Sequence, residues 1–222
     1  MRRLGIKLGV ALVTLGTLSG MAVPSVASAK QAPSFKNSDL QRYYKSAKSK
    51  TAFHFKSVKS GKRVQNYLVL GDFGKQVGIR YGVPTTTFKL SNRGRTLSCK
   101  YRLINFKTTN KQTPQASLSK KTYNFKLTKK SATKFTTKFT TKLSTTKQRY
   151  LSTSGKTYTY TLTKKNPAKS YANKYAKPTL TKQVSQALDI QYPDVSAAER
   201  QKATTKQVNQ YLKTLVANFN LK

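Results

Sequence analysis

Apolar side chains alternate with polar ones over much of this chain, and this period of two restricts the fold more than any other feature. Phe53 and Phe55 fall on one face of a predicted strand, and His54 falls on the other. A second such face carries Leu97, Cys99, Tyr101 and Leu103. Successive side chains of a strand point to opposite faces, so this alternation predicts strands that bury one face.

The chain divides into five predicted parts. Strands are expected at 51–58, 63–70, 76–81, 85–90 and 96–106. They belong to a basic β-rich domain over residues 51–165. Before it, residues 30–50 form a polar lead-in, in which Ser38-Asp39 predicts the cap of a short helix through Lys48. After it we expect a linker at 166–178 and a helical segment at 179–222, and residues 1–29 form the fifth part.

An internal repeat lies inside the β-rich domain. Residues 121–130 recur as 156–165, at an offset of 35 residues and with identity at seven of ten positions. Each copy predicts a strand with aromatic and Leu side chains on one face, followed by a basic turn. These turns hold Lys129-Lys130 and Lys164-Lys165, and a fainter copy at 88–95 places Arg93 and Arg95 equivalently. The pattern favours one structural unit used more than once, against chance similarity in a Thr- and Lys-rich sequence.

The stretch between the two copies has apolar residues at every fourth position. Because Thr favours strands over helices, we expect Phe135, Phe139 and Leu143 to face the core. Lys134, Lys138 and Lys142 then face water. Such a lysine row also protects a sheet edge from aggregation, which is the simpler explanation for it.

The C-terminal segment changes to helical spacing. Ser196 and Glu199 match a capping box at the start of a final helix. That helix carries an apolar stripe of Val208, Leu212, Leu215, Val216 and Phe219. The stripe favours a docking face over a membrane-active helix. The predicted class is therefore α+β: an antiparallel β-rich module, as a meander, sandwich or barrel, with a C-terminal helical segment.

The charge of the chain is strongly one-sided. Residues 73–188 contain 26 Lys or Arg among 116 residues and no Asp or Glu. A large single-sign field repels itself and opposes compaction. We therefore expect the counter-charge to reside on a partner, which makes a polyanion the predicted ligand class.

The N-terminus has the features of a secretory signal peptide. A basic start is followed by an apolar run, 8–23, and by Ala27-Ser28-Ala29, so cleavage is expected after Ala29. Three of the 44 basic residues are lost with it, and 41 remain against five acids, a formal net charge of +36. No later apolar run predicts a transmembrane span, and no wall-sorting motif ends the chain. We expect a protein that is released or held non-covalently on the cell wall.

Residues suited to catalysis are scarce. The chain offers five acids, one His and one Cys, without metal-ligand spacing or a phosphate-binding glycine loop. Thr96-Leu97-Ser98-Cys99, with His54 and Arg102, resembles the T-L-x-T-C pattern of sortases, but it is one residue short. Arg102 also falls on the strand face opposite Cys99. We expect no catalytic residue, no metal and no cofactor, a buried Cys99, and His54 as a surface residue.

The exported chain is disulfide-free, very basic and rich in Lys, Thr and Tyr. In composition it resembles the wall-associated and S-layer-type surface proteins of lactic acid bacteria, and no shared motif transfers functional residues. The resemblance implies anionic wall polymers, such as teichoic and lipoteichoic acids, as partners. The alternative is a secreted adhesin, or an antimicrobial or nucleic-acid-binding cation, that acts on host glycans, another cell or extracellular DNA.

The polyanion-binding residues are expected in the repeat turns and the lysine row. They are Arg93, Arg95, Lys129, Lys130, Lys134, Lys138, Lys142, Lys164 and Lys165. Like turns of equivalent units often meet at one end of a sheet, and their backbone amides add to a phosphate site there. The simpler alternative is that these are ordinary solvated turns and that attraction is spread over the whole surface.

Overall fold

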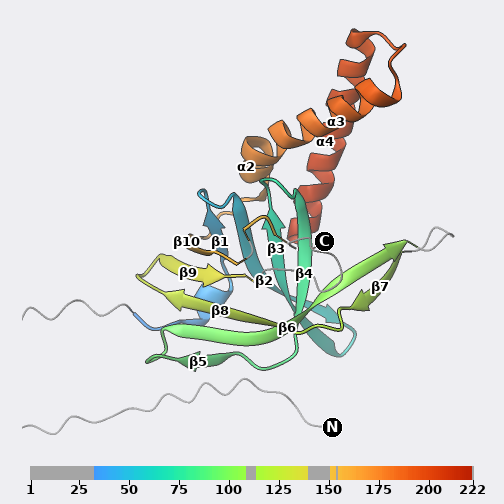
Figure 1. Ribbon diagram of the computed structural model, residues 1–222. Helices are drawn as coiled ribbons and strands as arrows, with labels where there is room; N and C mark the ends of the chain where they lie inside the picture. The colour runs from blue at the N-terminus through green and yellow to red at the C-terminus, as the bar shows by residue number, and fades with distance from the viewer. Residues whose placement is uncertain (1–32, 109–113, 140–150, 154, 222) are drawn as a thin grey trace, which may run out of the picture. The chain divides into compact units, whose positions relative to one another are not determined.

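Eight antiparallel strands close into a barrel, shown in Figure 1. They are β1 (Tyr43–Ser46), β2 (Thr51–Ser60), β3 (Arg63–Asp72), β4 (Gly78–Pro84), β6 (Thr96–Thr108), β8 (Tyr123–Lys129), β9 (Lys134–Lys138) and β10 (Thr157–Thr163). Their order is β4-β3-β2-β1-β10-β9-β8-β6, and pairing of β4 with β6 completes the circuit. The predicted α+β class is confirmed, and the structure selects the barrel among the three predicted architectures.

The computed structural model describes residues 33–108, 114–139, 151–153 and 155–221. The predicted signal peptide, residues 1–29, lies outside the described residues, as do Lys142 and Leu143. Two further strands, β5 (Lys89–Ser91) and β7 (Pro114–Leu118), pair with opposite parts of the long strand β6. A short helix, α1 (Asn37–Leu40), precedes the barrel.

The barrel interior is filled by the residues that alternate inward. The fully buried side chains of this interior include those of Tyr44, Phe53, Leu68, Tyr101, Tyr123, Phe125, Leu127, Phe135 and Tyr160. An eight-stranded barrel is just wide enough for side chains to fill. At the β4–β6 closure, Gly82 leaves room for a ring, because a Cβ there would lie 2.6 Å from Cδ2 of Tyr101. Closure therefore places an aromatic ring against a residue without a side chain.

The helix predicted from Ser38 through Lys48 is wrong. Helix α1 ends at Leu40, and Tyr43–Ser46 form β1, which pairs with both β2 and β10. Tyr44 is completely buried, and its ring stacks on that of Phe53 with centroids 4.5 Å apart. Pairing on both edges and burial of Tyr44 outweigh the helical spacing of the local sequence.

Four consecutive helical elements follow the barrel. They are α2 (Ala168–Tyr171), the π-helix η1 (Ala172–Ala176), α3 (Lys177–Gln191) and α4 (Ala197–Asn220). The linker predicted at 166–178 is therefore helical from Ala168 onward. The π-helix η1 ends two residues before Pro178, which has no backbone N–H to donate to an α-helical ladder. Ser196 caps α4 as predicted, since its Oγ accepts the Glu199 amide at 3.3 Å.

A second core joins these helices to the outer face of the barrel. The predicted stripe of α4 packs there, and Phe219 is completely buried among Tyr43, His54 and Phe73. Strands β2 and β3 are consequently covered on both faces. Among the described residues, no helix combines the length and apolar character that a membrane span requires.

Candidate polyanion interface

Four of the five acidic residues have partners within the described structure, and two of these four, Asp39 and Asp72, are buried. Asp72 is fully buried, and it accepts the amides of Gly74 at 2.8 Å and Ser152 at 2.6 Å. Asp189 pairs with Arg200 at 2.8 Å, and Glu199 takes part in the cap of α4. Asp39 is buried in an ion pair. The acids therefore neutralise very little of the basic surface.

Lys129 is the partner of Asp39, so it is not available to an external anion. Its ammonium donates to Asp39 Oδ2 at 2.6 Å and to the Ser34 carbonyl at 3.0 Å, and the residue is 4% exposed. The side chain of Lys129 points into the barrel, as that of Leu127 does two residues earlier on β8. Residues 33–40 cover this end of the barrel. The equivalent Lys164 of the other copy is exposed beyond the end of β10.

The three basic turns do meet at one end of the sheet. Strands β8 and β10 both run antiparallel to β9 between them, so their C-terminal ends lie on the same side. Strand β5 has the same direction as β8, because both pair antiparallel with β6. Hydrogen bonds join these strands to the neighbouring turns: the amide of Lys129 on β8 donates to Arg95 O, and the amide of Leu162 on β10 donates to Thr133 O, both at 2.8 Å.

We call this group the basic edge. It consists of Arg93, Arg95, Lys130, Lys134, Lys164 and Lys165, which are exposed except for the half-buried Arg95. Within the described part of the chain, none of the six forms a salt bridge. From β5 to β10 the edge spans four strand spacings, about 19 Å along the sheet. This arrangement offers a row of unpaired cations to an extended anion.

The lysines predicted to form one row along β9 do not all lie in the basic edge. Lys134 begins the strand and lies in the basic edge, whereas Lys138 is exposed at the other end of β9. Four residues of strand separate them by about 13 Å. Lys142 lies outside the described residues. The inward positions of Phe135 and Phe139 agree with the predicted faces of this strand.

The structure separates the residues of the sortase-like pattern. Cys99 lies in the barrel core, where burial raises the pKa of its thiol to about 12. The expectation that His54 is a surface residue is wrong: it is 5% exposed beneath α4, on the outer side of β2. Its Nε2 donates to the Phe219 carbonyl at 2.8 Å. Arg102 instead binds backbone carbonyls of Leu118 and Ser119.

A surface cavity beside the end of α4 was not indicated by the sequence. Arg42, Lys56 and Asn220 contribute to its lining, together with His54. These residues come from a segment before β1, from β2 and from the last helix, so no local pattern connects them. Among the described residues, no three His, Cys, Asp or Glu side chains gather as metal ligands.

Comparison of the chain with protein-family models, with curated proteins and with solved structures finds no match in any of the three.

Proposed function

We propose that this is a secreted, non-enzymatic surface protein that binds anionic cell-wall polymers such as teichoic acids through its basic edge. The partner is a chain of phosphate groups rather than a single anion. Lysine is a hydrated point charge that suits diffuse phosphate contact, and four of the six edge cations are lysines. Binding of this kind releases counterions and depends strongly on salt.

The uncompensated edge is the observation that carries the proposal. Asp39 is already paired with the buried Lys129, the residue next to Lys130 of the edge. The edge cations therefore face solvent without a counter-charge from the described residues. Such a concentration of like charge costs stability in the free protein, and a polyanion that lies along the edge removes that cost.

A pair of variants with equal charge loss tests the proposal. The edge variant carries Arg93→Gln, Lys130→Gln, Lys164→Gln and Lys165→Gln. The control variant carries Lys182→Gln, Lys202→Gln, Lys206→Gln and Lys213→Gln, all exposed positions on α3 and α4. Affinity for purified teichoic acid is measured across a salt series, alongside binding to whole walls and to walls stripped of teichoic acid.

The edge variant should lose most of the affinity and about 3 units of the slope of log affinity against log salt. The control should lose little, and stripped walls should bind poorly. Equal losses in the two variants would contradict a localised edge and leave a diffuse cationic surface. Undiminished binding to stripped walls, or stronger binding to duplex DNA at equal phosphate concentration, would favour the alternative of another extracellular polyanion.

A further inference from the structure

A polar cavity of about 410 Å³ lies on the outer face of the barrel, next to the C-terminal end of α4. Gln41 and Arg42 enter it from the segment before β1, Tyr43 from β1, His54 and Lys56 from β2, and Asn220 from α4. The cavity volume falls in the range of small-ligand sites, about 300–1,000 Å³. Asn220 of α4 closes one side of it, and the segment before β1 and strands β1 and β2 supply the rest.

The charged groups of the cavity are all positive. Arg42 and Lys56 contribute a guanidinium and an ammonium, and no described acid lines the cavity. Neither cation forms a salt bridge within the described residues. The guanidinium presents its donors in a planar fork that matches two oxygens of a phosphate. The cavity therefore has the charge and the donor geometry for a bound oxyanion.

The neutral polar side chains beside these cations suit a ligand that carries more hydrogen-bonding groups than an inorganic ion does. Gln41 and Asn220 carry side-chain amides, and Tyr43 carries a phenol. Amides and phenols donate and accept hydrogen bonds, which suits a ligand with hydroxyl groups. We propose that the cavity binds one polyol-phosphate unit, with its phosphate on Arg42 and Lys56 and its hydroxyls on the neutral side chains.

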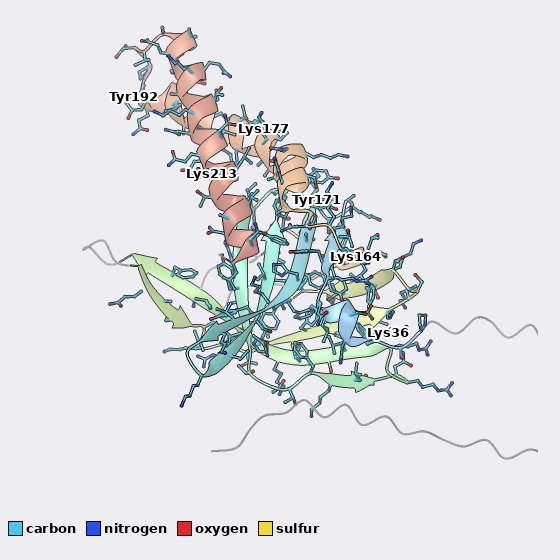
Figure 2. The ribbon with its side chains drawn as sticks, turned by 180° about the vertical axis from the view of Figure 1, so that it is seen from behind. Lys36, Lys164, Tyr171, Lys177, Tyr192 and Lys213 are labelled. Atoms are coloured by element: carbon cyan, nitrogen blue, oxygen red, sulfur yellow. The ribbon has the colours of Figure 1, made fainter. Side chains whose placement is uncertain are left out.

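The cavity continues the basic edge. Tyr43, the first residue of β1, pairs with Thr163, the last residue of β10. Arg42 precedes Tyr43 and Lys164 follows Thr163, so both lie just beyond the same pair of strand ends; Figure 2 labels Lys164 beside the barrel. The inference rests on the proposed function and deepens it: a polymer that follows the edge places one of its units in the cavity.

His54 gives a direct readout, because it is the only histidine in the chain and lines the cavity. The protein, labelled with ¹³C, is titrated with sn-glycerol 3-phosphate, with glycerophosphoglycerol and with sodium chloride at matched ionic strength, while the imidazole signals are followed by NMR. Both polyol phosphates should shift these signals in a saturable manner, and chloride should not. Tighter binding of the diester identifies a polymer unit as the source, and tighter binding of the monoester identifies a free polyol phosphate.

Arg42→Gln should weaken this binding at least tenfold, and Arg42→Lys should restore part of it. Lys45→Gln is the matched control, because it removes the same charge from β1 but lines a different cavity, with Tyr171 and Tyr175. Equal, non-saturating shifts with all three solutes, or unchanged binding in Arg42→Gln, would overturn the cavity assignment. In that case retained teichoic acid binding, with its dependence on the edge, would leave the proposed function standing.

Discussion

Lys129 shows how burial changes the role of a single charged residue. It forms an ion pair with Asp39, with side chains 3% and 6% exposed, and its ammonium lies 5.5 Å from the centre of the Phe135 ring. Removing one partner of a buried pair leaves an uncompensated charge. The pair therefore holds residues 33–40 over the end of the barrel.

Lys129→Met should lower the free energy of unfolding by about 3–5 kcal/mol, because it leaves the Asp39 carboxylate buried and unpaired. Lys130→Gln, at the exposed neighbouring position, should change it by less than about 0.5 kcal/mol. Urea unfolding of both variants measures the difference. A cost for Lys129→Met below that of Lys130→Gln would show that the pair contributes nothing.

His54 should make stability depend on pH. Burial lowers its pKa below 6.5, partly opposed by its hydrogen bonds to Phe219 O and Phe55 O, while the charge of Lys56 lowers it further. The unfolded chain takes up a proton near 6.5 while the folded chain resists it. The stabilisation is therefore complete above 6.5 and is lost as the pH falls below it.

Unfolding free energies measured from pH 7.5 to pH 5 should decline for the wild type on the acid side of this range. His54→Gln, which keeps a donor for Phe219 O, should show a flatter profile. Parallel profiles would mean that other groups carry the pH dependence.

At the scale of elements, the final helix is held through one deeply inserted ring. Phe219 is completely buried, and it contacts Tyr43, His54 and Phe73. Phe219→Ala should cost about 3–5 kcal/mol in unfolding free energy, because it leaves a cavity between α4 and the barrel. Tyr211→Ala, on the same helix but 56% exposed, should cost less than about 1 kcal/mol. Similar costs for the two would contradict a docked helix.

The elements that sequence reasoning found are those whose signal is local. The alternation predicts which faces of β2, β6 and β8 point inward, because each of these strands has an apolar residue at every second position. Strand β1 was missed because its four residues acquire their structure from β2 and β10. The alternation of β8 places Lys129 on the same inward face as Leu127, and this can be deduced from the sequence. Its ion-pair partner Asp39 cannot, because it lies 90 residues away along the chain. The cavity was missed because it joins β1, β2 and α4.

At the scale of the molecule, the proposed function makes net charge the determinant of retention on the wall, and the chain expected after signal cleavage carries +36, from 41 basic residues and five acids. If charge alone holds the protein there, washing cells with about 1 M salt should release most of it, because the Debye length falls to about 3 Å. Immunoblots of the wash and of the cell pellet measure the released fraction, and an osmotically matched sucrose wash is the control. Sucrose leaves the Debye length unchanged, so it should release little. Retention through the salt wash, with release only after wall hydrolysis, would contradict electrostatic attachment and require a non-ionic contact with the wall.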